Sequence, residues 1–294
     1  MVRAVLCVFL LSSCSSRNKT QEEAKGRQDS LDALLHLEGQ DLDDADSPQG
    51  HAARELLEAL LPSSKRPPSQ ERPQSGDPWR VWKWNEGNAP LKVVVFESDR
   101  NKFIPGNSQA FVHVFSERGE IISTSTFHTG WRIGLTDARR IESSGIGIPL
   151  LEIHSEQLRN GADMARQYYA LLSGEVALVR LENSRGEAVR NSYRFGNHLI
   201  GPEPPRRSAE SWEAIILSRE PATALSGLVW LGGNHLDLSW PYMRPESGTA
   251  ELEDMDQFKM WEEVRKRPAV RRRMDELRQS SIDWIQEEAL LVRD

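Results

Sequence analysis

Cysteine is almost missing from this chain, which has two in 294 residues, Cys7 and Cys14. None follows Cys14, so a disulfide framework, a cysteine-ligated zinc site and thiol catalysis are excluded for the remainder. Long apolar runs are also missing, because Ala4 to Leu11 falls short of the roughly 20 residues that span a bilayer. The net charge of −7 lacks the basic excess that duplex binding needs, so no nucleic-acid partner is expected.

Compact catalytic motifs are missing as well. The chain has no Gly-x-Ser-x-Gly elbow, no phosphate-binding loop and no His-Glu-x-x-His pair, and Gly145-Ile146-Gly147 lacks the third glycine of a dinucleotide loop. No two of the seven histidines stand at metal-ligand spacing. We therefore expect no catalytic residues, no metal site and no cofactor, and favour a protein that is not an enzyme.

The first residues predict an exported protein. Arg3 supplies a positive charge, Ala4 to Leu11 is an unbroken apolar run, and the small residues Ser12 and Ser13 precede Cys14. A charged start, an apolar centre and a small-residue cleavage site are typical of a secretory signal peptide, here residues 1–13.

The end of this segment, Leu11-Ser12-Ser13-Cys14, resembles the lipobox of bacterial lipoproteins. The resemblance implies that Cys14 receives a diacylglyceryl thioether, becomes the N-terminus after cleavage and is acylated there, so that the membrane is a partner through the lipid anchor. Cys7 follows a bulky leucine, which leaves Cys14 as the sole candidate. Ser15 after the cysteine implies a bacterial cell-envelope location that favours the outer membrane. The alternative is an ordinary signal peptide cut nearby.

Residues 14–76 predict a lipidated, disordered tether, since they are rich in Gln, Glu, Asp, Ser and Pro and bury little apolar area. Two short helical motifs interrupt it. Ser30 is positioned to cap a helix through Leu31, Leu34 and Leu35, and residues 51–61 place four leucines on one face. These motifs either dock in a partner's groove, or else fold against their own domain or form only transiently, and we favour the second interpretation.

Residues 77–206 predict a β-rich domain. The hydrophobic period is two, and turn signals separate strands expected at 91–97, 109–117, 120–127, 148–154, 176–182 and 187–194. Residues 167–172 fit either a helix or a strand, and the turn signal Ser173-Gly174 that follows favours a strand. Trp79, Trp82 and Trp84 precede them and are interpreted as buried rather than as a platform for sugars. The pattern favours an antiparallel β-sandwich or an open barrel.

Residues 207–294 predict a helical region, which makes the fold class α+β. Ser208 caps one helix, Ser218 starts a second that ends at Gly232, and residues 251–266 are helical. A helix from Pro268, a short break with a capping-box pattern at Ser280, and a helix with Trp284 together resemble a HEAT-like helical repeat over 268–291. That resemblance implies a protein partner on the helical region.

The weak candidates for a functional site are His128, Arg132, His198 and His235. His128 and Arg132 flank a glycine at a predicted strand end, and the two other histidines lie in repeated Gly-Asn-His-Leu segments. Loop histidines shuttle protons or bind metals, but they also commonly end strands and helices, and we favour the latter here. The favoured function is a lipoprotein with a non-enzymatic interaction or scaffold role. The alternatives are a β-domain that binds an apolar or glycan ligand, and an envelope hydrolase that uses His128 or His198.

Overall fold

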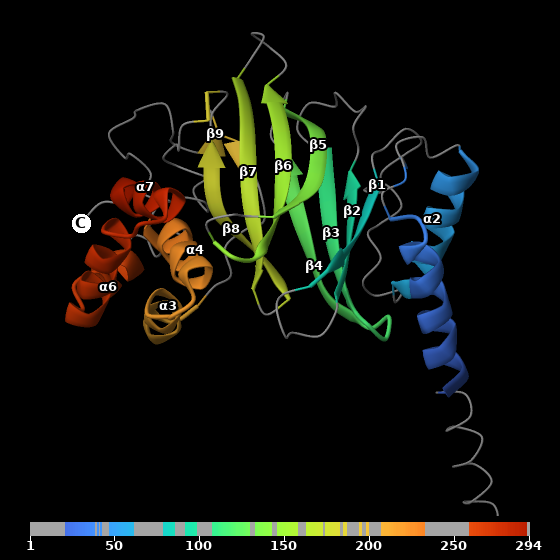
Figure 1. Cartoon of the computed structure of the whole chain (residues 1–294), viewed down its shortest axis with the longest axis horizontal. Coiled ribbons are helices and arrows are strands. Elements are labelled where there is room, and N and C mark those ends of the chain that lie inside the picture. Colours follow the sequence, from blue (N-terminus) through green and yellow to red (C-terminus); the bar gives the residue numbers. More distant parts are fainter. Residues whose placement is uncertain are drawn as a thin grey trace, which may run out of the picture.

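The computed structural model has the α+β architecture expected from the sequence, with helices at both ends of a β-rich centre (Figure 1). Within the part of the chain it describes, no helix combines the length and apolar character needed to cross a membrane. The described residues are 21–38, 40, 42, 47–61, 79–85, 92–98, 108–129, 133–142, 146–157, 163–172, 174–182, 185–186, 194–195, 198–199, 207–232 and 259–292.

Eight of the strands form two antiparallel four-stranded sheets, each an up-and-down meander in chain order. The first sheet consists of β1 (Trp79–Trp84), β2 (Lys92–Ser98), β3 (Ser108–Ser116) and β4 (Ile121–Thr129). The second consists of β5 (Ile133–Glu142), β6 (Pro149–Gln157), β7 (Asp163–Leu172) and β8 (Glu175–Glu182). A separate antiparallel pair is formed by β9 (Arg194–Phe195) and β10 (His198–Leu199).

The two sheets meet at both edges, β4 beside β8 and β1 beside β5, so they enclose a shared interior. At one edge Ser123 on β4 donates a hydrogen bond to the carbonyl of Gly174, in the turn between β7 and β8. At the other, the Arg140 guanidinium on β5 lies 5.7 Å from the ring centroid of Trp84 on β1. The predicted sandwich or open barrel is thus confirmed. Of the three tryptophans interpreted as buried, Trp84 is buried, Trp82 is partly buried, and the side chain of Trp79 lies outside the described residues.

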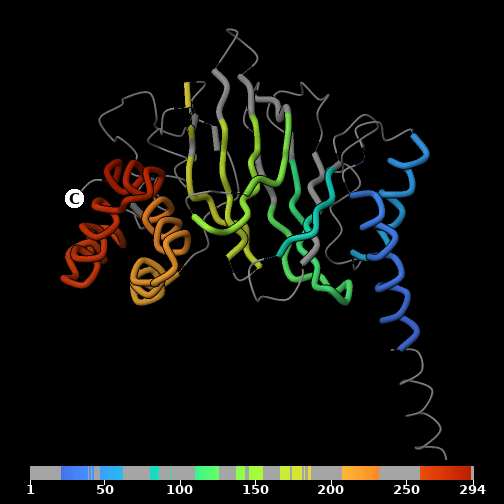
Figure 2. Tube along the Cα trace, in the orientation of Figure 1, coloured from blue at the N-terminus to red at the C-terminus, as the bar shows by residue number. Residues whose placement is uncertain are grey.

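Helices formed by residues 21–35 and by α2 (Pro48–Leu60) pack on the first sheet; we call them the N-terminal helices (Figure 2). Both contribute to a second hydrophobic core that includes Val81 of β1 and Phe115 of β3. The members from the N-terminal segments are Leu31, Leu34, Leu42, Ala53, Leu57, Leu60 and Leu61. Each leucine stabilises this packing by about 1.5–3 kcal/mol relative to exposure, which offsets the entropy cost of ordering these two segments.

Two segments inside the predicted tether are therefore folded, and the favoured interpretation, that they pack on their own domain, is confirmed. The start of the first helix was predicted wrongly. Ser30 lies inside the helix and donates from its hydroxyl to the carbonyl of Gly26, instead of capping the N-terminus. Ser47 caps α2, because its side chain accepts a hydrogen bond from the amide of Gly50 at 3.0 Å.

The C-terminal helices pack on the second sheet and share its core. They are α3 (Ala209–Ile216), α4 (Pro221–Gly232), a helical segment over 259–264, α6 (Pro268–Arg278) and α7 (Asp283–Leu291). Helix α4 contacts β7 and β8, while α7 contacts α4 and α6. Ser208 caps α3 as predicted, accepting from the amide of Ser211 at 3.3 Å.

Two local predictions for this half of the chain are wrong. The capping box before α7 does not form: Ile282 is the N-cap residue without a side-chain cap, and the Ser280 hydroxyl instead accepts from the Ile282 amide. Strand β5 was not predicted at all. Its charged residues hide the alternation of apolar positions that reveals a strand.

Candidate functional site

Two neighbouring rows of polar side chains lie on the outer surface of the second sheet, and we call these eight side chains the polar face. Each strand contributes two residues at positions i and i+2, which point to the same side of a sheet. The members are Asp137 and Arg139 of β5, Glu152 and His154 of β6, Arg166 and Tyr168 of β7, and Arg180 and Glu182 of β8. Strand register places Arg139, Glu152, Tyr168 and Arg180 side by side, and the other four in the next row.

Half of the polar face is buried under α7. Arg180 is 3% exposed, and its Nε donates to Glu182 Oε1 at 2.7 Å. Its Nη1 forms an ion pair at 2.8 Å with Oε2 of Glu287 on α7, and its guanidinium lies 4.8 Å from the ring centroid of Trp284. Trp284 also stacks at a tilt on Tyr168, with centroids 4.7 Å apart. Arg180 thus joins α7 to the sheet.

The pKa values of Tyr168 and Arg180, in the buried half, fit a structural role. Burial raises the pKa of the Tyr168 hydroxyl, and its hydrogen bond to Glu182 raises it further, so the phenol stays neutral. Burial by itself lowers the pKa of the Arg180 guanidinium, but the contacts with Glu287 and Glu182 outweigh it and hold the pKa above its ordinary value. Neither group exchanges a proton near neutral pH, so neither is a general acid or base.

The other half of the polar face reaches solvent. Arg139 has a side chain 53% exposed and pairs with Asp137 Oδ2 at 3.1 Å and with Glu152 Oε2 at 3.6 Å. His154 Nε2 lies 2.8 Å from Glu152 Oε1. Arg166 is exposed in the next strand. A histidine and a carboxylate in contact resemble a catalytic pair in geometry, but a nucleophile is also required, and none is described beside them. The side chains of Glu152 and His154 are themselves largely buried, so this half presents mainly Asp137, Arg139 and Arg166 to solvent.

The sequence candidates fall largely outside the described residues. Cys14, Arg132 and His235 lie there, so the structure does not test them. The backbone places His128 on β4, opposite Gln109, and His198 on β10, opposite Phe195. The two strands are in contact, which brings these chain segments together, but the side chains of both histidines are outside the description. The expectation that these histidines end strands, and do not catalyse or bind a metal, therefore stays a prediction.

The interior between the sheets bears on the ligand-binding alternative. Large side chains from both sheets point into it, and those of Trp84, Val112, Ile153, Tyr169 and Leu178 are at most 1% exposed. A ligand-sized cavity would leave its walls accessible to water, so none adjoins these five side chains.

His113, on the outer surface of the first sheet, is also buried, and its Nδ1 lies 3.1 Å from the Thr124 hydroxyl. These positions have the packing of a structural core.

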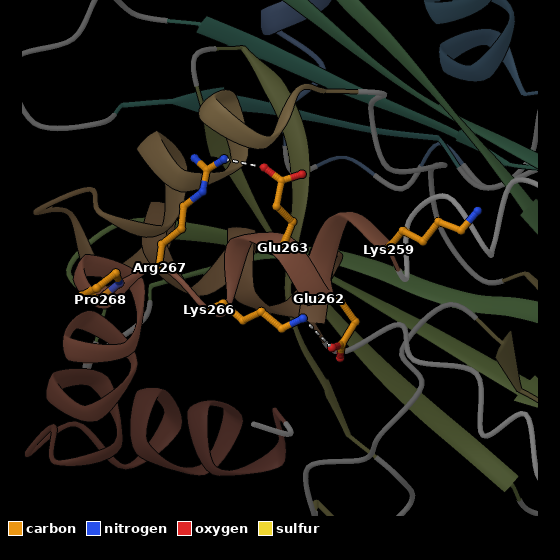
Figure 3. Close-up of a pocket in the computed structure, with 6 residues that line it drawn as sticks. All are labelled: Lys259, Glu262, Glu263, Lys266, Arg267 and Pro268. Atoms are coloured by element: carbon orange, nitrogen blue, oxygen red, sulfur yellow. Dashed lines mark hydrogen bonds and ion pairs between the residues drawn. The ribbon is translucent and has the colours of Figure 1, made fainter.

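An open surface hollow lies between the segment over 259–264 and α6 (Figure 3). Its charged side chains pair with each other: Arg267 Nη2 lies 2.7 Å from Glu263 Oε1, and Lys266 Nζ lies 3.6 Å from Glu262 Oε2. Arg267 also reaches Glu213 on α3, so the hollow is a junction of helices. A hydrogen bond from Arg265 holds the pKa of Glu262 below its usual range. The hollow is wide open to solvent, whereas a small-molecule site encloses most of its ligand.

Sequence reasoning missed the polar face, although a signal for it exists. In β5 to β8, pairs of polar residues at i and i+2 interrupt otherwise apolar strands, and four such pairs in one sheet form a continuous surface. Only the register shows that the pairs are neighbours. Two β-bulges matter here, because they shift Asp137 on β5 and Arg180 on β8 into line with their partners.

Among the described residues, no cluster of three or more histidine, cysteine, aspartate or glutamate side chains is arranged to hold a metal ion. Comparison with known proteins finds no family model, no curated protein and no solved structure that matches this chain. The interpretation of the polar face therefore depends on its own geometry.

Proposed function

We propose that this protein is a lipid-anchored lipoprotein of a bacterial cell envelope with a non-enzymatic role in interaction or scaffolding. The observation that carries the proposal is the segment Leu11-Ser12-Ser13-Cys14, which has the order of residues of a lipobox. Two or three acyl chains on one cysteine anchor a protein stably, whereas a single chain binds only marginally. By the same resemblance, Ser15 favours the outer membrane.

The exposed half of the polar face supports the interaction role. Its solvent-reaching side chains Asp137 and Arg139 carry opposite charges and form an ion pair at 3.1 Å, so both are oriented before a partner arrives. Preorganised charges contribute specificity and association rate more than affinity. The exposed surface of α6, which carries Arg271, Arg272 and Asp275, is a second contact region, as the HEAT-like resemblance implies.

Anchoring is tested by expressing the full chain, Cys14→Ala and Cys7→Ala in bacteria, and measuring intact mass and membrane association. The wild type and Cys7→Ala are expected to carry the added mass of the acyl groups and to leave the membrane only in detergent. Cys14→Ala is expected to lack that mass and to wash off in buffer. Separation of inner from outer membranes by density checks the location. A wild-type protein with the mass of bare polypeptide would disprove the proposal.

The interaction role is tested by placing a photo-crosslinking amino acid at Arg139 in cells. The matched control is the same amino acid at Arg118, which is exposed in the turn between β3 and β4. Crosslinks at Arg139 that are absent at Arg118, and that are lost in a charge-reversed Arg166→Glu background, support the polar face as the contact. Equal crosslinking at both positions would argue against it.

The hydrolase alternative is tested by His128→Ala and His198→Ala. Under the proposal, cells that produce either variant at the same level as the wild-type protein show the same phenotype as wild-type cells. Loss of the phenotype in folded, correctly located variants would favour the enzyme instead. The ligand-binding alternative predicts quenching of tryptophan fluorescence by apolar compounds or glycans, and the proposal predicts none.

A further inference from the structure

The N-terminal helices are fixed parts of the β-domain. Besides the leucines in the shared core, Glu38 Oε1 accepts a hydrogen bond from the backbone amide of Lys83 on β1 at 2.8 Å. The turn between β3 and β4 also touches the first helix closely, since a Cβ atom at Gly119 would lie 2.9 Å from the Arg27 carbonyl oxygen. Three independent contacts therefore set the direction of the first helix relative to the sheet.

The start of the first helix projects beyond the end of the β-domain that carries the 117–120 turn. Residues 21–26 are all exposed, and the first buried side chain is Leu31 (Figures 1 and 2). The turn at Gly174 lies at this same end, because its carbonyl accepts from Ser123 at the start of β4. Strand β8 begins after that turn and runs to the opposite end, where Glu182 lies opposite Arg166 in the strand register.

The chain between Cys14 and this helix is short. Seven residue steps separate Cys14 from Gln21, and even a fully extended chain spans at most about 25 Å over that length. A disordered tether of residues 14–76 would have allowed the domain any orientation. With the helix docked, attachment at Cys14 holds one chosen end of the β-domain near the lipid.

We propose that the membrane-anchored protein is oriented, with the end that carries the 117–120 turn toward the bilayer and the far end of β8 away from it. The inference rests on the proposed function, because it requires the lipid on Cys14. It places the last residues of β4, with His128, on the side away from the membrane, because β4 begins at the near end and runs to the far one. Strand β10, with His198, contacts β4.

The test measures resonance energy transfer from single labelled positions to acceptor-labelled lipid in liposomes that hold the purified lipidated protein. The chain has no cysteine after Cys14, so Arg118→Cys and Arg185→Cys each give one labelling position. Arg118 is exposed in the near turn and Arg185 is exposed after β8. The strands between these ends are ~30 Å long, so transfer from position 118 is expected to be at least about twofold more efficient.

A released form provides the control. Leu31→Asp with Leu34→Asp places charges in the shared core and undocks the helix, whereas Ala33→Asp adds a charge at an exposed position of the same helix. The difference between positions 118 and 185 is expected to vanish in the double variant and to persist in Ala33→Asp. Circular dichroism and the fluorescence of the tryptophans report whether the β-domain of the double variant stays folded.

Equal transfer from the two positions in the lipidated wild type, or stronger transfer from position 185, overturns the inference and leaves the lipoprotein proposal standing. A protein whose intact mass shows no lipid overturns the proposed function, and the orientation falls with it. The mass measurement and the transfer measurement thus separate the two failures. The wild-type comparison decides the orientation even where the double variant fails to fold.

Discussion

Replacing Arg180 with leucine tests whether the buried half of the polar face holds α7 on the sheet. The guanidinium is 3% exposed and contacts three groups: Glu182 on its own strand, and Glu287 and Trp284 on α7. Leucine keeps part of the aliphatic packing but supplies no donor or charge. Among the described residues, the carboxylate of Glu182, whose side chain is 8% exposed, then keeps the hydrogen bond from Tyr168.

The expected loss is large because one member of a buried pair is left behind. Removing one partner of a buried ion pair costs about 3–5 kcal/mol, since the remaining charge is desolvated without compensation. Loss of the contact with the Trp284 ring adds about 0.5–2 kcal/mol. The matched control is Arg139→Leu on the same face. Its side chain is 53% exposed, and the buried Glu152 keeps its contact with His154 when Arg139 is lost, so the pairs of Arg139 with Asp137 and Glu152 contribute about 0–1 kcal/mol.

Urea unfolding followed by tryptophan fluorescence measures both losses. A double variant, Arg180→Leu with Glu182→Leu, is expected to recover part of the stability, because no buried charge remains without its partner. The unfolding midpoint should therefore fall most for Arg180→Leu, less for the double variant and least for Arg139→Leu. Equal midpoints for Arg180→Leu and Arg139→Leu would refute the argument that burial decides the strength of these pairs.

Three further predictions concern turns, tyrosines and a helix cap. Gly174 and Gly186 both have positive φ, but a Cβ at Gly174 would overlap a side chain on β4, while one at Gly186 meets open space. Alanine at 174 should therefore lower the unfolding midpoint more than alanine at 186, and equal losses would contradict the contact. Burial raises the pKa of Tyr168 and Tyr169, so each folded residue keeps its proton above the unfolded pKa of about 10. Stability from both is present below that pH and is lost as pH rises, so tyrosinate absorbance should appear only with unfolding; earlier ionisation would contradict their burial. Ser208→Ala removes the cap of α3 and should cost about 0.5–2 kcal/mol, whereas an unchanged midpoint would show that the cap is dispensable.

The strands that sequence reasoning located share one property, an alternation of apolar and polar residues that needs no partner to be visible. The strands expected at 109–117 and 176–182 match β3 and β8 to within about one residue. Strand β5 escaped because Asp137, Arg139 and Arg140 interrupt its alternation. The strand accommodates these charged residues because they form ion pairs within β5 and with Glu152 on the neighbouring strand β6. A single stretch of sequence does not show such cross-strand partners.

The N-terminal segments illustrate a different limit. Composition correctly marks residues 14–76 as poor in apolar area on average, and the spacing of leucines correctly marks two helices within that stretch. Neither property states what covers the leucines. Short helices are marginal alone, so only the hydrophobic surface of the first sheet, with Val81 and Phe115, turns them into fixed structure.

By itself the sequence determined the fold class and the positions of the helices and most strands. It also excluded disulfides, cysteine-ligated zinc and thiol catalysis for the residues after Cys14, because none of them is a cysteine. These properties depend on local periodicity and composition, which a linear chain displays directly. Only the tertiary structure decided which strands are neighbours, that four separated polar pairs form one face, and that the N-terminal helices join the β-domain. Those outcomes depend on strand register and on burial between segments distant in the chain, where each surface is specified by a partner that local sequence does not contain.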